Sequence, residues 1–162
     1  MTETELFDTA NAVTVASFKL AEDYFKTAFT LPTIALNQRG KIAGSAHLQK
    51  NLIKLNKQLF IENIEEFKRQ VIPHEVAHLV CFQKFGKVKP HGSEWKSVMR
   101  AVFKLDAAVT HKLDVASVGM REFSYQCECP DLIKLSAVRH NKVKKGKQQY
   151  RCQKCKTVLL PS

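Results

Sequence analysis

The run His74-Glu75-Val76-Ala77-His78 constrains this chain more than any other part of its sequence. It lies inside segment 65–85, whose apolar residues predict one helix, and on a helix two histidines four residues apart share one face. Both imidazoles can then reach one metal ion, and Glu75 can accept a proton from a water on that ion. Zinc suits imidazole ligands and activates water. The run therefore predicts a helix with a catalytic zinc site, in which His74 and His78 are ligands and Glu75 is the general base.

A catalytic zinc ion usually has three protein ligands, so one more donor must come from elsewhere in the chain. His91 is the best candidate, because it precedes a second expected helix in a loop where the following glycine permits a sharp turn. Glu94 is the main rival, since zinc peptidases with two histidines and one glutamate exist. His47 and His111 are weaker rivals. Twelve residues separate His78 from His91, too many for the compact HExxHxxGxxH arrangement.

Four of the five cysteines lie close to the end of the sequence, as a CxC pair (Cys127 and Cys129) and a CxxC pair (Cys152 and Cys155). Four thiolates are the ligand set of closed, structural zinc sites, and we expect a second, structural zinc ion here. The CxC spacing departs from the usual CxxC. Two alternatives therefore stay open: four free thiols that pack a small β unit, or a site in which His140 replaces a cysteine. The fifth, Cys81, is expected to be a buried small hydrophobe.

Positive charge gathers in the same region. The chain has 26 Lys and Arg against 15 Asp and Glu, and residues 127–162 alone carry nine basic and two acidic residues. A basic module of this kind favours a polyanionic partner, and we expect DNA. The alternative is a charged hairpin that contacts only solvent. The predicted nucleic-acid contacts are Arg139, Lys142, Lys144, Lys145, Lys147, Tyr150 and Arg151, with the tyrosine stacking on a base.

The remaining patterns predict an α+β protein with domains 1–120 and 121–162. The apolar stretches are too short for a bilayer-spanning helix, and the first ten residues are acidic and lack the apolar core of a secretory signal. We therefore expect a cytoplasmic monomer without membrane contact. The expected helices are 4–29, 65–85 and 93–105. Asn63 would cap the second helix, Pro73 would kink it near Arg69 and Gly86 would end it, and Ser93 would cap the third. The expected strands 33–37, 41–49 and 51–56 form a small antiparallel sheet, with a hairpin connection at 38–40 and a turn at 50–51. The strands 125–129, 132–138 and 148–160 lie around the cysteines, and the basic stretch between the cysteine pairs is expected to form a ribbon hairpin.

Several of these motifs together resemble one known family. HEVAHLV, then PHGSEW, then THKLD, and finally a basic segment with YQCEC and YRCQKC are similar to the bacterial SprT family. The wider SprT-like group includes the eukaryotic Spartan proteases, which act on DNA–protein crosslinks. The resemblance extends over nearly the whole chain, and the pair HExxH and HGxxW is its most specific part.

The resemblance implies a compact zincin-like metallopeptidase domain followed by a zinc-ribbon-like module. It also implies that His74, His78 and His91 are zinc ligands and that Glu75 is the general base. The function we expect is cleavage of peptide bonds in a protein substrate by a metal-activated water, on proteins associated with nucleic acid. The alternative is a non-enzymatic, zinc-containing regulator that binds nucleic acid.

Overall fold

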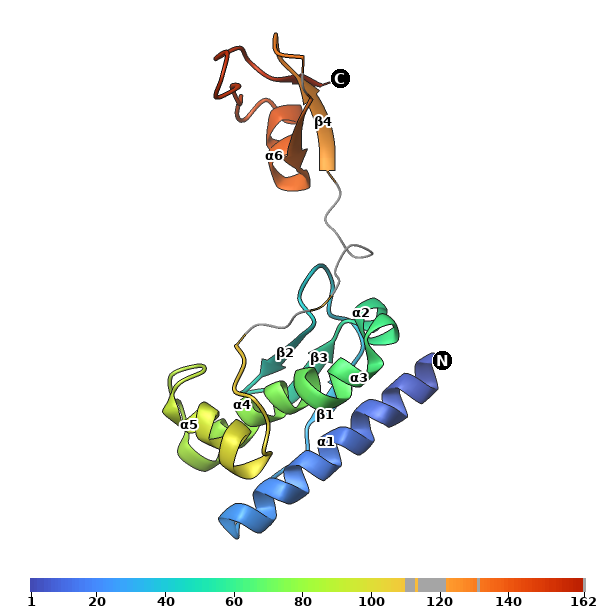
Figure 1. The fold of residues 1–162 in the computed structure, drawn as a ribbon, viewed down its shortest axis with the longest axis vertical. Coiled ribbons are helices and arrows are strands. Elements are labelled where there is room, and N and C mark those ends of the chain that lie inside the picture. Colours follow the sequence, from blue (N-terminus) through green and yellow to red (C-terminus); the bar gives the residue numbers. More distant parts are fainter. Residues whose placement is uncertain (110–112, 114–121, 131, 162) are drawn as a thin grey trace. The chain divides into compact units, whose positions relative to one another are not determined.

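The structure, a computed structural model, describes residues 1–109, 113, 122–130 and 132–161 (Figure 1). The chain divides into two compact units, Met1–Val118 and Gly119–Ser162. The predicted domain boundary between residues 120 and 121 lies outside the described residues.

Helix α1 (Glu3–Phe25) opens the first unit. Thr2 caps it, because its side chain accepts a hydrogen bond from the backbone N–H of Glu5 at 3.1 Å. The helix ends earlier than the predicted residue 29, because Lys26 adopts a left-handed conformation (φ 53°) that stops the helical hydrogen bonding. Its buried face packs against the HExxH helix described below.

The small sheet contains β1 (Thr33–Ala35), β2 (Gly44–His47) and β3 (Leu52–Leu55) in the order β1-β3-β2. Strands β2 and β3 are antiparallel, and the predicted turn between them is present, with Asn51 at φ 49°. The predicted hairpin connection at residues 38–40 is wrong, because β1 pairs with β3 and runs parallel to it. Strand β2 therefore lies at an edge of the sheet.

Two short helices, α2 (Lys57–Glu62) and α3 (Ile64–Glu66), lead into the long helical segment. The cap of α2 is Asn56, whose side chain accepts from the backbone N–H of Leu59 at 3.1 Å. Asn63 occupies the N-cap position of α3, but its side chain makes no capping bond and instead donates backwards to the carbonyl of Leu59.

A π-helical turn, η1 (Phe67–Val71), precedes α4 (Ile72–Phe85), which carries the HExxH run. The sequence predicts a kink near Arg69, and the π turn occupies that position. Pro73 has no N–H to bond to the fourth residue before it. In the structure it lies in the first turn of α4, where a missing donor is tolerated, and the widened turn precedes it. Gly86 ends α4 as predicted.

Helix α5 (Ser93–Ser97) and a second π turn, η2 (Val98–Val102), follow α4 along the chain. Gly92 occupies the cap position and Ser93 is the first helical residue, so the predicted cap is displaced by one residue. The core joins α1, the sheet, α4 and α5 around fully buried large side chains: Leu6, Phe18, Ile53, Leu59, Phe60, Phe67, Ile72 and Met99.

In its described residues, the second unit combines an antiparallel sheet with a helix. Strands β4 (Glu122–Gln126), β5 (Ile133–Ser136) and β6 (Leu160–Pro161) lie in the order β5-β4-β6. Helix α6 (Ala137–Lys144) follows β5 directly, capped by the Ser136 side chain. This basic stretch is predicted from its sequence to form a ribbon hairpin, and that prediction is wrong. The whole chain is thus an α+β protein with a zinc-ribbon-like module that contains the four late cysteines.

Candidate functional site

Three histidines converge in the first unit. His74 and His78 lie one turn apart on α4, and His91 reaches them from the loop before α5. The Nε2 atom of His91 lies 3.0 Å from that of His74 and 3.1 Å from that of His78. The structure therefore brings together the three residues that the sequence analysis names as ligands of a catalytic metal.

The spacing of these nitrogens fits a zinc ion. With a tetrahedral ion about 2.0–2.1 Å from each imidazole, neighbouring nitrogens would lie roughly 3.3 Å apart, close to the spacings in the structure. Three protein donors also leave one position of such an ion open, as catalytic zinc sites require. The donor set is thus suited to a metal ion that binds and activates water.

Burial sets the protonation of the residues around this site. Burial lowers the pKa of His78 to about 4, and the nearby His91 lowers it by a smaller amount. Burial also lowers the pKa of His91. Both rings are therefore neutral at pH 7, and neutral imidazole is the form that binds a metal. Glu75 is 5% exposed, and burial raises its pKa to about 8. A bound cation nearby would lower that pKa again and favour the carboxylate.

The other predicted donors do not join the three histidines. Glu94 lies on α5, where its carboxylate accepts a hydrogen bond from Ser93 at 3.3 Å. His47 lies on β2 and its Nε2 is 3.1 Å from the hydroxyl of Ser45. His111 lies outside the described residues. Of the described residues, the first unit offers this one group of three closely spaced metal donors.

Strand β2 packs closely on the side chain of Glu75, and the glycine at its start permits this. A Cβ atom at Gly44 would lie 3.2 Å from the Lys54 carbonyl oxygen, 3.2 Å from Leu55 Cδ2 and 3.4 Å from Glu75 Cγ. A side chain at this position would therefore push against both β3 and the glutamate. The sequence analysis missed this role, although a glycine inside a strand pattern is a recognised sign of close approach.

The four late cysteines also converge. Their sulfur atoms all lie within 4.8 Å of one another, and those of Cys129 and Cys152 are 3.9 Å apart. A tetrahedral zinc ion with bonds of about 2.3 Å would place pairs of sulfurs roughly 3.8 Å apart. Backbone N–H groups donate to two of the sulfurs, from Cys129 to Cys127 and from Lys154 to Cys152. Such bonds stabilise thiolates, so this group fits a closed structural metal site.

His140 is not part of the cysteine group. Its ring stacks on Phe123 with centroids 3.7 Å apart, and its Nδ1 lies 2.8 Å from the Tyr125 hydroxyl. The alternative in which His140 replaces a cysteine is therefore wrong. Cys81 is buried on α4, as expected, and burial raises the pKa of its thiol to about 12.

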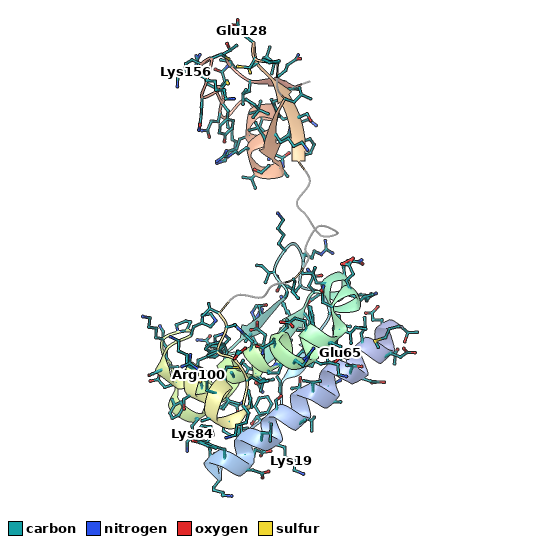
Figure 2. All side chains as sticks on the ribbon, in the orientation of Figure 1. Lys19, Glu65, Lys84, Arg100, Glu128 and Lys156 are labelled. Atoms are coloured by element: carbon teal, nitrogen blue, oxygen red, sulfur yellow. The ribbon has the colours of Figure 1, made fainter. Side chains whose placement is uncertain are left out.

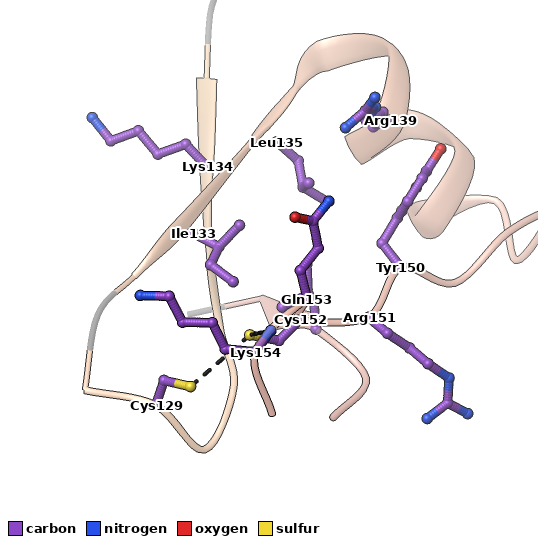
Figure 3. A pocket seen from close by; sticks show the side chains of 11 residues that line it. Cys129, Ile133, Lys134, Leu135, Arg139, Tyr150, Arg151, Cys152, Gln153 and Lys154 are labelled. Carbon is purple, nitrogen blue, oxygen red and sulfur yellow. Dashed lines mark hydrogen bonds between the residues drawn. The ribbon is translucent and has the colours of Figure 1, made fainter. Parts of the chain in front are cut away.

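The predicted nucleic-acid contacts divide between helix α6 and a cavity. Arg139, Lys142 and Lys144 lie on α6, and Lys145 and Lys147 follow it. A cavity of about 380 Å³ in the same unit is lined by Arg139, Tyr150 and Arg151 (Figure 3). The other residues that line it are Cys129, Ile133, Lys134, Leu135, Cys152, Gln153, Lys154 and Leu159.

Tyr150 and Arg139 lie together at this cavity. The Arg139 guanidinium is 5.6 Å from the centroid of the Tyr150 ring, a cation–π distance. Arg151 donates to the Lys156 carbonyl at 3.0 Å, which fixes the segment that precedes Cys152. The cavity therefore combines an apolar interior with cationic side chains.

Comparison with known proteins shows the family of this chain. The model of the SprT-like family matches residues 14–112. Protein SprT of Pasteurella multocida is 49% identical over 142 residues, which are 88% of this chain and 86% of that protein. Protein SprT of Vibrio parahaemolyticus is 48% identical over 151 residues, 93% of this chain and 91% of that protein.

No solved structure matches the chain. In the part of the chain that the structure describes, no helix is both long enough and apolar enough to cross a membrane.

Protein SprT of Shewanella oneidensis is 47% identical over 142 residues, 88% of this chain and 90% of that protein. On the family match, these identities and the HExxH and HGxxW motifs, the chain belongs to the SprT-like family.

Proposed function

We propose that this protein is a zinc-dependent metallopeptidase that cleaves proteins bound to nucleic acid. The observation that carries the proposal is the convergence of three imidazole nitrogens, 3.0 and 3.1 Å apart, on the helix turn that also holds the buried Glu75. A purely structural metal site needs no carboxylate beside an open position. The pairing of both features therefore supports an enzyme over a non-enzymatic regulator.

The residues of the site would divide the chemistry between them. A zinc ion held by His74, His78 and His91 would lower the pKa of a bound water to about 7 and polarise a peptide carbonyl. Glu75 would take the proton from that water and then deliver it to the leaving amine. Its buried position supports this role, because a carboxyl group with a pKa near neutral can both accept and release a proton.

Strand β2 offers a place for the substrate. The edge of β2 that faces away from β3 has no partner strand among the described residues. The first residue of β2, Gly44, packs on Glu75. An extended polypeptide that adds to this edge would be held by main-chain hydrogen bonds beside the general base. Main-chain recognition depends little on side chains, so we propose broad sequence specificity.

A direct test is cleavage of an unfolded polypeptide by the zinc-loaded full-length chain, with single-stranded DNA present and absent. A metal chelator should abolish cleavage, and added zinc should restore it. Cleavage that survives complete removal of zinc would contradict the proposal, and so would absence of cleavage by protein that holds both metal ions.

Replacing Gly44 by alanine is expected to slow cleavage and to lower the free energy of unfolding by about 1–3 kcal/mol. The new methyl group would press against the Lys54 carbonyl, Leu55 and Glu75, so the glutamate or the strand must shift. The three histidines are untouched, so zinc content should stay the same. Rates, thermal unfolding and metal analysis measure the three effects.

Ser45→Ala is the matched control for Gly44→Ala. Ser45 is the next residue of β2, and its side chain points to the opposite face, where it bonds to Gln38. Its replacement should leave the cleavage rate nearly unchanged. Equal rates for Gly44→Ala and the wild type would show that Glu75 does not depend on close packing by β2.

The basic module is the proposed DNA-binding part, with single-stranded DNA as the preferred form. The cavity that Tyr150 lines has a size in the range of small-ligand pockets, and its apolar residues suit a nucleobase. Lysines of α6 and the turn after it would neutralise phosphates. Stacking on a tyrosine requires an unpaired base, which supports the preference for a single strand.

Replacing Lys142, Lys144, Lys145 and Lys147 by glutamine is expected to weaken DNA binding and to flatten its dependence on salt. The log–log slope should fall by about 0.7 for each phosphate of a single strand that is no longer neutralised. Tyr150→Ala should weaken single-strand binding by about 1–3 kcal/mol without changing the slope. Affinities measured over a series of salt concentrations separate these two effects.

The control removes the same amount of charge from the first unit. Lys19, Lys26, Lys41 and Lys50 are all exposed there, and Lys19 projects from α1 (Figure 2). Their replacement by glutamine should leave the salt slope nearly unchanged. Equal slopes for both four-glutamine variants would place DNA binding outside α6 and the turn after it.

A further inference from the structure

The position of His91, the third histidine of the metal group, is not set by the geometry of the helix that carries the other two. His74 and His78 are placed together by helix periodicity alone. His91 instead lies in a turn closed by a bond from the Gly92 N–H to the Lys89 carbonyl at 3.0 Å, and its φ is 57°, unusual for a residue with a side chain. A contact from outside the turn must therefore fix it against α4.

Trp95 makes that contact. It lies on α5, four residues after His91, and it is 1% exposed. Its ring centroid lies 4.7 Å from those of His74 and His91 and 5.6 Å from that of His78. One side chain thus touches all three imidazoles.

The same residue is also bonded to the HExxH helix. The indole N–H donates to the backbone carbonyl of His74 at 3.2 Å, a bond within the buried core. This bond ties α5, and with it the loop that carries His91, to α4. The His91 ring meets the indole edge to face, at 90°, whereas the His78 ring lies nearly parallel to it, at 25°. The two ligands from different segments are therefore oriented by one rigid surface.

We propose that Trp95 is a positioning residue that preorganises the three histidines for metal binding. The indole bond fixes the distance between α5 and α4, and the indole ring fixes the directions of the imidazoles. Without Trp95, the metal ion itself would have to order His91 on binding, and this would lower the affinity of the site for the metal. The inference rests on the proposed zinc binding and is independent of peptidase activity.

The fluorescence of Trp95 gives the first test. It is the only tryptophan in the chain, so its emission reports on this site alone. Co²⁺ bound to the three histidines should quench this emission strongly. Quenching should disappear in His74→Ala and persist in Cys152→Ser, which alters the other metal group. Unquenched emission from wild-type protein that holds Co²⁺ at the histidines would overturn the proposed contact.

The second test is metal affinity in Trp95→Phe and Trp95→Leu, followed through the visible absorption of Co²⁺ bound by nitrogen ligands. Trp95→Leu removes the ring and the bond and should weaken binding at least about tenfold, the range seen for residues that orient metal ligands. Trp95→Phe keeps a ring but has no N–H donor, so its affinity should fall between those of the wild type and Trp95→Leu.

Phe18→Leu separates positioning from a general decrease in stability. Phe18 is fully buried in the same core, and its ring packs against that of Phe29 with centroids 6.1 Å apart. This variant should unfold at a lower temperature but bind Co²⁺ with the affinity of the wild type. If Trp95→Leu binds within twofold of the wild type, or if affinity falls as much in Phe18→Leu, the positioning role is wrong. Failure of the wild type to bind metal at the histidines would instead refute the proposed zinc site.

Discussion

The Glu75→Gln variant is expected to retain its zinc and its fold but to cleave peptide bonds about 10²–10⁴ times more slowly than the wild type. Glutamine has nearly the shape of glutamate, so the packing against β2 and Gly44 is preserved. It cannot take a proton from water at neutral pH, so only the proton transfer is removed. Cleavage rates under substrate saturation, with metal analysis of the same samples, measure the effect.

Glu94→Gln is the matched control for that experiment. Glu94 is a carboxylate near the metal group in sequence, but it does not belong to the group of close metal donors. Its neutralisation should leave the cleavage rate within a small factor of the wild type. Full activity of Glu75→Gln would refute its role as general base. A large decrease in Glu94→Gln alone would move that role to Glu94.

The 162-residue chain is expected to bind two zinc ions, and single substitutions should remove them one at a time. His74→Ala removes one of three imidazole donors and should release the ion of the first unit only. Cys152→Ser removes one of four thiolates and should release the ion of the second unit only. Metal analysis of the purified variants counts the ions directly. A single ion that disappears only with Cys152→Ser would refute the catalytic site.

Removal of the cysteine-bound ion should change the structure more than removal of the histidine-bound ion. Among the described residues, the core of the second unit has four buried side chains, Tyr125, Leu135, Cys152 and Leu159, far fewer than that of the first unit. So small a core contributes little to folding, and binding of a structural zinc ion supplies an apparent free energy of about 10–16 kcal/mol. Cys152→Ser should therefore make residues 122–161 sensitive to limited proteolysis, while the first unit stays resistant.

Cys81→Ala is the control for the cysteine substitutions. Cys81 is a buried thiol on α4 that lies outside both groups of metal donors. Its replacement should keep both zinc ions and the protease resistance of the second unit. Absence of an ion from Cys81→Ala would show that the two groups do not account for the metal content.

The wrong predictions have two physical causes: a long-range strand pairing overrode the local pattern in the sheet, and a local side-chain bond overrode it at α6 and at Asn63. The runs 33–37 and 41–49 follow one another, which favours a hairpin, but β3 pairs with both and separates them. The basic stretch after β5 contains residues typical of strands, yet Ser136 caps it and it forms α6. Asn63 matches the spacing of a capping residue, but the carbonyl of Leu59 takes its side chain.

The sequence by itself determined the features that depend on spacing along one element. Four residues on a helix bring His74 and His78 to one face, and two residues between cysteines allow Cys152 and Cys155 to share an ion. The end of α4 at Gly86 is likewise local.

Only the tertiary structure decided which distant residues complete each site. The sequence left the third donor open between His91, Glu94, His47 and His111, because each lies outside the helix that carries the other two histidines, where periodicity places no residue. The packing of α5 on α4 brings His91 to within 3.1 Å of both other imidazoles, and it buries Trp95 against all three. The order of the sheet likewise places Gly44 on Glu75. Periodicity fixes neighbours within an element, whereas contacts between elements depend on how the whole core packs.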